Sequence, residues 1–130
     1  MTAIIKHAKL VELLLRKSRE RQLAWKETAD ENTFQVSFPK SSVQIWWTED
    51  GVQVGLVNDK GETVDSFTNY DLRMLINTLR NDDPFAFMVD GEYAAVGTTS
   101  DAVKELYHLA RRTSLGADKA LDDVLSELAG

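Results

Sequence analysis

The sequence predicts an α+β fold, in which an antiparallel β-meander plus a hairpin pack against an N-terminal helix, a middle helix and two C-terminal helices. Three observations predict it. Apolar residues recur at helical spacings near both ends of the chain, they alternate with a period of two in the middle, and turn-forming residues separate the alternating runs. The 130 residues fit one domain, so we expect residues 1–130 to form a single α+β domain.

Residues 3–27 show the pattern of an amphipathic helix whose first half is apolar on more than one side. Leu10 and Leu13 point away from the main stripe, and Leu13 lies nearly opposite to it. Because such a helix is usually buried on more than one side, we expect a partner subunit to cover these leucines. A few tolerated surface leucines are the alternative. The main stripe consists of Ile4, Ala8, Val11, Leu15, Ser18, Gln22 and Trp25.

After the polar stretch 27–32 the apolar period falls to two, which predicts a meander of three strands and a short fourth strand over residues 62–67. Asp50-Gly51 predicts a two-residue hairpin turn, because glycine tolerates the positive φ that such turns need. Residues 58–61 mark the next turn. The alternating apolar residues are Phe34, Val36 and Phe38, then Val43, Ile45 and Trp47, and then Val52, Val54 and Leu56.

Residues 70–80 have the spacing of a middle helix, which Thr68 or Asn69 can cap. Residues 85–89 and 93–97 predict a second hairpin joined around Asp90-Gly91.

Two helices are expected to end the chain. Ser100 or Asp101 can cap the first, which runs to Thr113, and Gly116 is a natural stop between the two. The last helix has an acidic side and an apolar side. The apolar side consists of Leu121, Val124, Leu125 and Leu128.

Charge is unevenly distributed along the chain. Fifteen Lys and Arg against 21 Asp and Glu give a net charge of −6, which disfavours nucleic-acid binding by the molecule as a whole. Residues 1–26 instead carry seven cations against two acidic residues. We expect this basic segment to contact an acidic surface, on this chain or on a neighbouring copy. The alternative is a nucleic-acid-linked protein that sets Arg16, Lys17, Arg19 and Arg21 against phosphates.

The sequence contains no short motif that carries catalysis or binds a metal. The absence of cysteine removes thiol chemistry, and His7 and His108 lie on different predicted helices, so no zinc site is expected. The pairs Asp82-Asp83 and Asp122-Asp123 fit a helix-ending turn and a solvated helix face better than a cation site. We expect no catalytic residue, no metal and no cofactor. A small-molecule site between the sheet and the helices is the alternative.

Trp46-Trp47 is the most conspicuous dipeptide. Alternation puts Trp47 on the core face and Trp46 on the other face. With a turn at Asp50-Gly51, Trp46 falls opposite Gly55, and an aromatic ring over a cross-strand glycine stabilises a sheet. Trp46 can equally serve as a contact anchor, since tryptophan is enriched at binding hot spots. The candidate partner-binding residues are Leu10, Leu13, Arg16, Lys17 and Trp46.

No stretch approaches the roughly 18 apolar residues of a membrane span. Lys6, His7, Lys9 and Glu12 interrupt any apolar core of a signal peptide. Together with the lack of cysteine, these features predict a cytoplasmic protein.

Residues 25–36 and 106–128 resemble a family of short uncharacterised bacterial proteins. The resemblance is carried by Trp25-Lys26-Glu27-Thr28, by Leu-Tyr-x-x-Ala-Arg-Arg at 106–112, and by Leu-Gly-x-Asp-x-Ala-Leu-Asp at 115–122. It implies a bacterial cytoplasmic accessory protein and brings no activity or site residues. The predicted order of elements is also similar to that of type III secretion chaperones, which are dimers that hold extended segments of their clients. The widely apolar N-terminal helix, an outward-facing Trp46, the uneven charge and the lack of a catalytic motif favour a non-enzymatic, homodimeric protein-binding module.

Overall fold

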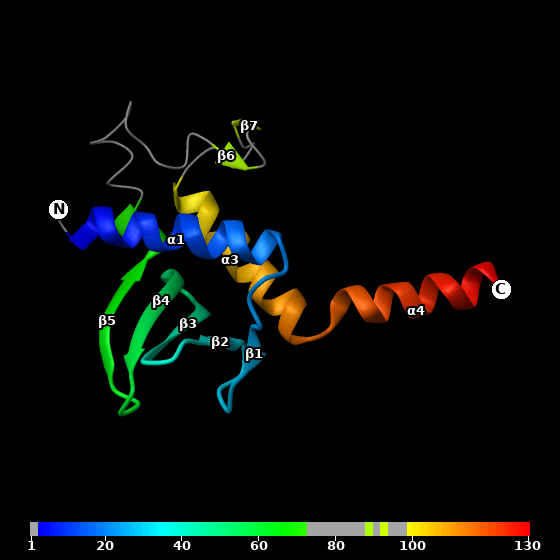
Figure 1. Cartoon of the computed structure of the whole chain (residues 1–130), viewed down its shortest axis with the longest axis horizontal. Helices are drawn as coiled ribbons and strands as arrows, with labels where there is room; N and C mark the ends of the chain where they lie inside the picture. The colour runs from blue at the N-terminus through cyan, green and yellow to red at the C-terminus, as the bar shows by residue number, and fades with distance from the viewer. Residues whose placement is uncertain (1–2, 73–87, 90–91, 94–98) are drawn as a thin grey trace.

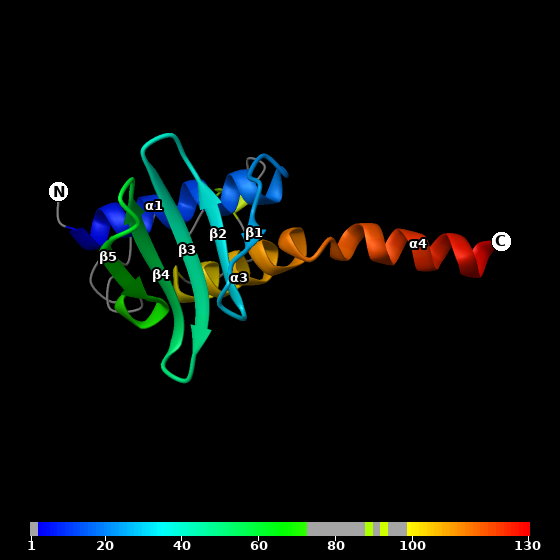
Figure 2. The same ribbon diagram turned by 90° about the horizontal axis from the view of Figure 1, so that it is seen from below.

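The computed structural model describes residues 3–72, 88–89, 92–93 and 99–130. Within these residues, helices α1 (Ala3–Arg19) and α3 (Thr99–Ser114) cover one face of a five-stranded antiparallel sheet (Figures 1 and 2). The predicted α+β class is therefore confirmed. The strands, in their order across the sheet, are β1 (Lys26–Glu27), β2 (Thr33–Ser37), β3 (Ser41–Thr48), β4 (Gly51–Asn58) and β5 (Thr63–Thr68).

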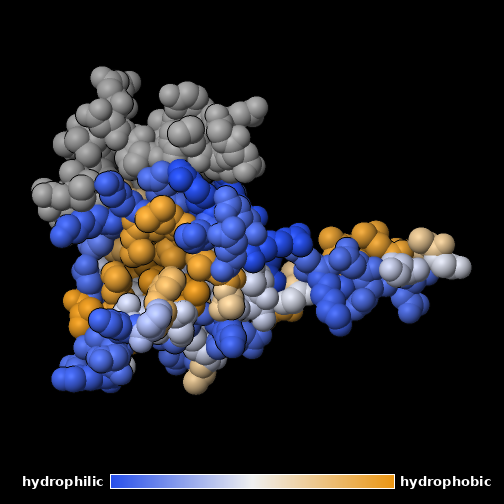
Figure 3. All heavy atoms as spheres, in the orientation of Figure 1, coloured by the Kyte–Doolittle hydropathy of each residue, from blue (hydrophilic) through white to orange (hydrophobic). Residues whose placement is uncertain are grey.

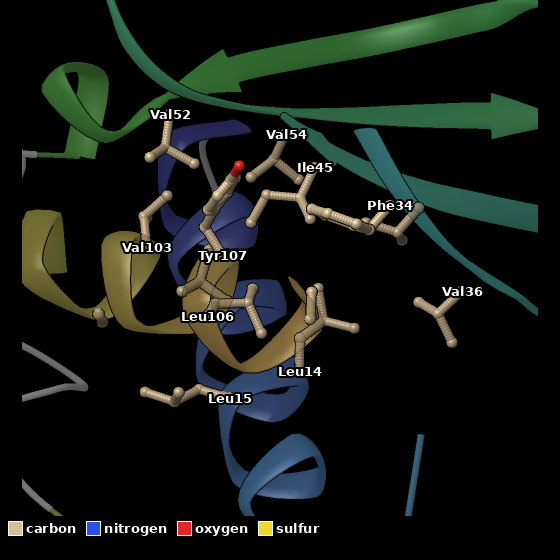
Figure 4. Close-up of a cluster of buried hydrophobic side chains, with 14 of the residues drawn as sticks. Leu14, Leu15, Phe34, Val36, Ile45, Val52, Val54, Val103, Leu106 and Tyr107 are labelled. Carbon is tan, nitrogen blue, oxygen red and sulfur yellow. The ribbon is translucent and has the colours of Figure 1, made fainter. Parts of the chain in front are cut away.

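The core lies between the sheet and the two helices (Figure 4). As the period of two predicts, alternate residues of the central strands face the helices, and the residues between them face the other way. Leu14 of α1, and Leu106 and Tyr107 of α3, are buried together with these strand residues. Figure 4 labels the strand residues Phe34, Val36, Ile45, Val52 and Val54.

Helix α1 ends at Arg19, earlier than the helical pattern over residues 3–27 predicts. The N–H of Arg21 donates to the Ser18 carbonyl oxygen (3.1 Å), and the N–H of Gln22 donates to the Lys17 carbonyl oxygen (2.9 Å). This bond pattern, with Arg21 in the left-handed region at φ 59°, ends a helix firmly. Trp25 is buried all the same, because the chain turns back and its Nε1 donates to Ser18 Oγ (2.9 Å).

Strand β1 is not predicted by the sequence pattern, because its two exposed polar residues show no alternation. It forms because the chain after α1 returns along the edge of β2, where Lys26 pairs with Gln35. The N–H of Thr28 then donates to the Thr33 carbonyl oxygen at 3.2 Å, which closes the β1–β2 connection.

The β3–β4 turn lies one residue earlier than predicted. A turn at Asp50-Gly51 requires Trp46 to pair with Gly55, but Thr48 pairs with Gly51 instead, which puts Trp46 two residues out of that register. Thr48 Oγ1 accepts the Asp50 N–H (3.1 Å) and donates to the Gly51 carbonyl oxygen (3.0 Å), so this side chain closes a two-residue turn at Glu49-Asp50. Because the register differs by two residues, every side chain keeps its predicted face.

The β4–β5 turn over residues 58–61 is confirmed. Asn58 Oδ1 accepts the N–H groups of Lys60 and Glu62, both at 2.9 Å, and Gly61 adopts a φ of 79°. The side chain of Asn58 thereby satisfies turn donors that would otherwise lack a partner within the turn.

Strand β5 leads into a helical segment that begins at residue 69. Thr68 Oγ1 accepts the Asp71 N–H (3.2 Å), and Asp71 Oδ2 accepts the Thr68 N–H (2.8 Å). This reciprocal capping arrangement confirms Thr68 as the cap. The predicted helix beyond residue 72 and the Asp82-Asp83 pair lie outside the described residues.

The predicted second hairpin is confirmed where the structure describes it, since β6 (Met88–Val89) pairs antiparallel with β7 (Glu92–Tyr93). The remainder of that hairpin lies outside the described residues. Helix α3 begins at Thr99, so Ser100 and Asp101 lie inside its first turn and do not cap it from outside.

The last helix, α4 (Ala117–Ala129), follows Gly116 as predicted and projects from the rest of the fold (Figures 1 and 2). The C-terminus lies at its far end. Among the described residues, no helix has both the length and the apolar character needed to cross a membrane.

Candidate protein-binding surfaces

An apolar stripe is exposed along α4. Leu121, Val124, Leu125 and Leu128 share one side of the helix because their spacing is i, i+3, i+4 and i+7. Their exposed fractions run from 52 to 79%, and no residue of α4 is buried. Figure 3 shows the stripe as a line of apolar atoms on the projecting helix. A helix with this pattern normally turns the stripe toward a core, so α4 presents to solvent a surface suited to burial.

Contacts at its N-terminal end set the direction in which α4 leaves the body. Gly116, at φ 64° in the left-handed region, separates α3 from α4. Asp118 Oδ1 lies 2.5 Å from Arg112 Nη2, and Asp118 Oδ2 lies 3.4 Å from Arg21 Nη2. The hydrogen bond from Arg112 lowers the pKa of Asp118 below its ordinary value. These ion pairs join the first turn of α4 to the ends of α3 and α1.

Acidic residues flank the stripe. Asp118, Asp122 and Glu127 lie beside it, whereas Asp123 lies on the far side, 3.9 Å from Lys119. Four acidic residues against one lysine give α4 a net charge of −3. The prediction that Asp122 and Asp123 are solvated is confirmed, since both are exposed. A surface that complements α4 would be apolar at its centre and positively charged at its rim.

The outer side of α1 has this complementary character. Leu13 is 51% exposed, and Leu10 is partly buried against the core. Lys6, Lys9 and Lys17 are all exposed, and they stand seven or four residues from Leu13, on the same side of the helix. With five Lys and Arg against one Glu, α1 carries a net charge of +4 when His7 is neutral. Figure 3 shows apolar atoms on α1 bordered by hydrophilic ones.

Three of the four cations considered for phosphate binding are engaged within the chain. Arg16 Nη2 lies 2.8 Å from Glu12 Oε1, and Arg19 forms a two-pronged ion pair with Glu105 of α3. Arg21 contributes to the Asp118 contact. Lys17 is exposed, and its Nζ lies 3.5 Å from Gln22 Oε1. Binding a phosphate with the arginines would therefore compete with an ion pair within α1 and with pairs that join α1 to α3 and the turn after α1 to α4.

The two neighbouring tryptophans have different surroundings. Trp46 is half-buried, and a Cβ placed on Gly55 would lie 3.1 Å from two of its ring atoms, so the ring covers this glycine across the strands. Trp47, which the pattern places in the core, is 50% exposed. Its ring meets Tyr107 edge-on at 5.6 Å, next to the exposed His108. Trp47 stands one residue from the end of β3, and it is the tryptophan with more surface to offer a partner.

Two hollows lie beside β1. A groove of about 640 Å³ runs along the β1–β2 edge and includes Leu23 and Phe38 in its lining. A smaller one, of about 260 Å³, lies between the loop that follows β1 and Arg111. Neither lining contains a histidine. In the described part of the chain, no group of three or more His, Asp and Glu could hold a metal ion.

His7 contacts strand β5 near the start of α1. Its Nε2 lies 2.6 Å from Asp65 Oδ2, and its ring stacks on Phe67 with centroids 4.2 Å apart. The hydrogen bond with His7 is the main cause that lowers the pKa of Asp65. The pair joins segments 58 residues apart in the sequence and forms part of the scaffold.

No protein-family model, curated protein or solved structure matches this chain. The assignment of a binding surface therefore rests on the residues themselves. Of the five candidates named from the sequence, Leu10, Leu13, Arg16 and Lys17 share α1, while Trp46 lies on the sheet face that α1 and α3 leave uncovered. The sequence leaves open whether the last helix packs on its own domain or reaches a neighbour, and α4 is not among the five candidates although its apolar stripe is visible there.

Proposed function

We propose that this chain is a non-enzymatic protein-binding module that presents α4 to another polypeptide. The observation that carries the proposal is the apolar stripe of α4, which the described part of the chain leaves uncovered. An isolated helix of about a dozen residues is only marginally stable in water. Burial would stabilise it, because each fully covered Leu or Val side chain contributes about 1.5–3 kcal/mol.

We also propose that the module works as a homodimeric accessory protein in the bacterial cytoplasm. The lack of cysteine fits a reducing compartment. The opposite net charges of α1 and α4 favour association between chains.

The proposal is tested by comparing three tagged chains for the polypeptides they retain: the natural sequence, the variant Leu121→Glu with Leu125→Glu, and Lys119→Glu. The double variant places two charges on the stripe. Lys119→Glu makes the same net charge change on the far side of α4 and serves as the matched control. Circular dichroism checks that all three fold.

We expect the natural chain and the control to retain a polypeptide in stoichiometric amount, whether a second copy or another protein, and the double variant to lose it. Retention by all three chains, or by none, would refute α4 as a binding element.

A further inference from the structure

We propose that the polypeptide covering α4 is a second copy of this chain, and that the α4 of each copy lies on the outer side of the partner's α1. This inference rests on the proposed function, since it names the occupant of the same surface.

The chain cannot cover its own stripe in the arrangement described. Helix α4 points away from α1 and α3 (Figures 1 and 2), and Asp118 ties its first turn to Arg112 and Arg21. The stripe residues lie beyond this tether, at Leu121 and after it. The described residues therefore leave the stripe uncovered, and we place the covering surface on another chain.

The outer side of α1 offers an apolar centre and positive charges that complement the apolar stripe and the acidic residues of α4. Leu13 offers an exposed apolar centre, and Lys6, Lys9 and Lys17 surround it. Opposite charges at the rim of an interface favour encounter and fix its register. The 17 residues of α1 also exceed the 13 of α4, so the whole stripe can find helix surface opposite it.

Two-fold symmetry satisfies both surfaces at once. Each copy carries one acidic helix, α4, and one basic helix, α1. A closed dimer therefore makes the same contact between α4 and α1 twice. Pairing α4 with α4 would instead bring together two helices of net charge −3 and leave Leu13 exposed. The charges thus favour contact of α4 with α1 over contact of α4 with itself.

A charge-reversal experiment distinguishes these arrangements. One chain carries Lys9→Glu and Lys17→Glu on α1, and the other carries Asp122→Lys and Glu127→Lys on α4. All four positions are exposed, so neither chain should lose its fold, which circular dichroism checks. A chain with Lys40→Glu and Lys60→Glu, at exposed positions outside the helices, is the matched control for the first. Light scattering after size exclusion gives each mass.

We expect the natural chain and the control to elute at twice 14.6 kDa. Each reversed chain alone should dissociate at least about tenfold more readily, because like charges then meet at the rim. An equimolar mixture of the two reversed chains should recover the dimer, since every acidic rim again meets a basic one.

Three results would overturn the inference: a monomeric natural chain at high concentration, an undiminished dimer with α1 reversed, or a mixture that stays monomeric. A dimer that tolerates α1 reversal but not the stripe variants would indicate pairing of α4 with α4. If the natural chain is monomeric but retains a different protein through α4, this inference and the proposed homodimeric state fail, whereas α4 stands as a protein-binding element.

Discussion

At the scale of single residues, a buried hydrogen bond secures the segment that follows α1. Trp25 Nε1 donates to Ser18 Oγ at 2.9 Å, and both side chains are buried. Removing one partner leaves the other polar group buried without its bond, which costs about 1–3 kcal/mol. The bond therefore determines how the chain returns from α1 to the edge of the sheet.

We expect Trp25→Phe and Ser18→Ala each to lower the free energy of unfolding, measured by urea denaturation. The double variant should lose less than the sum of the two, because neither polar group is then left alone. Strictly additive losses would show that the bond contributes nothing.

Two glycines at positive φ allow the cost of backbone strain to be measured apart from the cost of steric crowding. A Cβ on Gly51 would lie 2.3 Å from Asn69 Oδ1, the atom that accepts the Val52 N–H, whereas a Cβ on Gly61 would meet nothing within 4 Å. We expect Gly61→Ala to cost about 1 kcal/mol of stability from strain alone, and Gly51→Ala to cost clearly more. Thermal unfolding of both variants checks this, and equal losses would contradict the crowding at Gly51.

The His7–Asp65 contact predicts a pH dependence. A carboxyl group whose pKa is lowered by folding stabilises the fold above its ordinary pKa of 3.8, and the contribution is lost as the pH falls through the lowered pKa. We expect Asp65→Asn to be less stable than the natural chain near neutral pH and to converge with it in acid. Asp59→Asn, in an exposed turn, is the control. A constant difference between Asp65→Asn and the natural chain at every pH would contradict the linkage.

At the scale of elements, the apolar pattern predicts the meander and the helices, because burial of one face sets a period of two in strands and near 3.6 in helices. The turn beginning at Asn58 and the cap at Thr68 were predictable, since they depend on local side-chain bonds. The end of α1 was not, because Trp25 fits the helical stripe by position yet reaches the core by a turn back of the chain. The β3–β4 register depends on hydrogen bonds of the Thr48 hydroxyl. The prediction of a turn at Asp50-Gly51 rested on the conformational preference of glycine alone and did not include them.

The candidate site was predicted only in part. The pattern of α1 indicated an exposed Leu13, and the charges indicated a basic helix and an acidic remainder. That Trp47 is more exposed than Trp46 depends on where β3 ends relative to the core. The exposure of α4 depends on the direction that Gly116 and Asp118 give it, which an amphipathic pattern does not contain.

Amide hydrogen exchange over α4 tests whether this helix depends on association. A lone helix of this length frays in water, so its amides should exchange quickly in dilute solution and slow down as the protein concentration rises. Leu121→Glu with Leu125→Glu should remove that concentration dependence. Protection that persists at concentrations where the protein is monomeric would mean that α4 is covered within one chain.

At the scale of the whole molecule, the described residues form a sheet-and-helix body with one projecting acidic helix and one basic helix that shows an exposed leucine. Contact between these two surfaces in different copies would bury the α4 stripe and Leu13 and would oppose unlike charges. In such a dimer the sheet-and-helix body would carry, on α1, the surface that α4 of the other copy contacts. The projecting helix would carry the apolar stripe that makes this contact.

The most direct test of this account is the mass in solution of the Leu13→Glu variant beside that of the natural chain, measured by sedimentation equilibrium. Leu13 is exposed, so the substitution should leave the fold intact while it puts a negative charge where the proposed dimer would place the acidic α4 of the second copy. We predict twice 14.6 kDa for the natural chain and a folded monomer of that mass for the variant. A variant that remains dimeric would remove Leu13 from the interface and contradict the account.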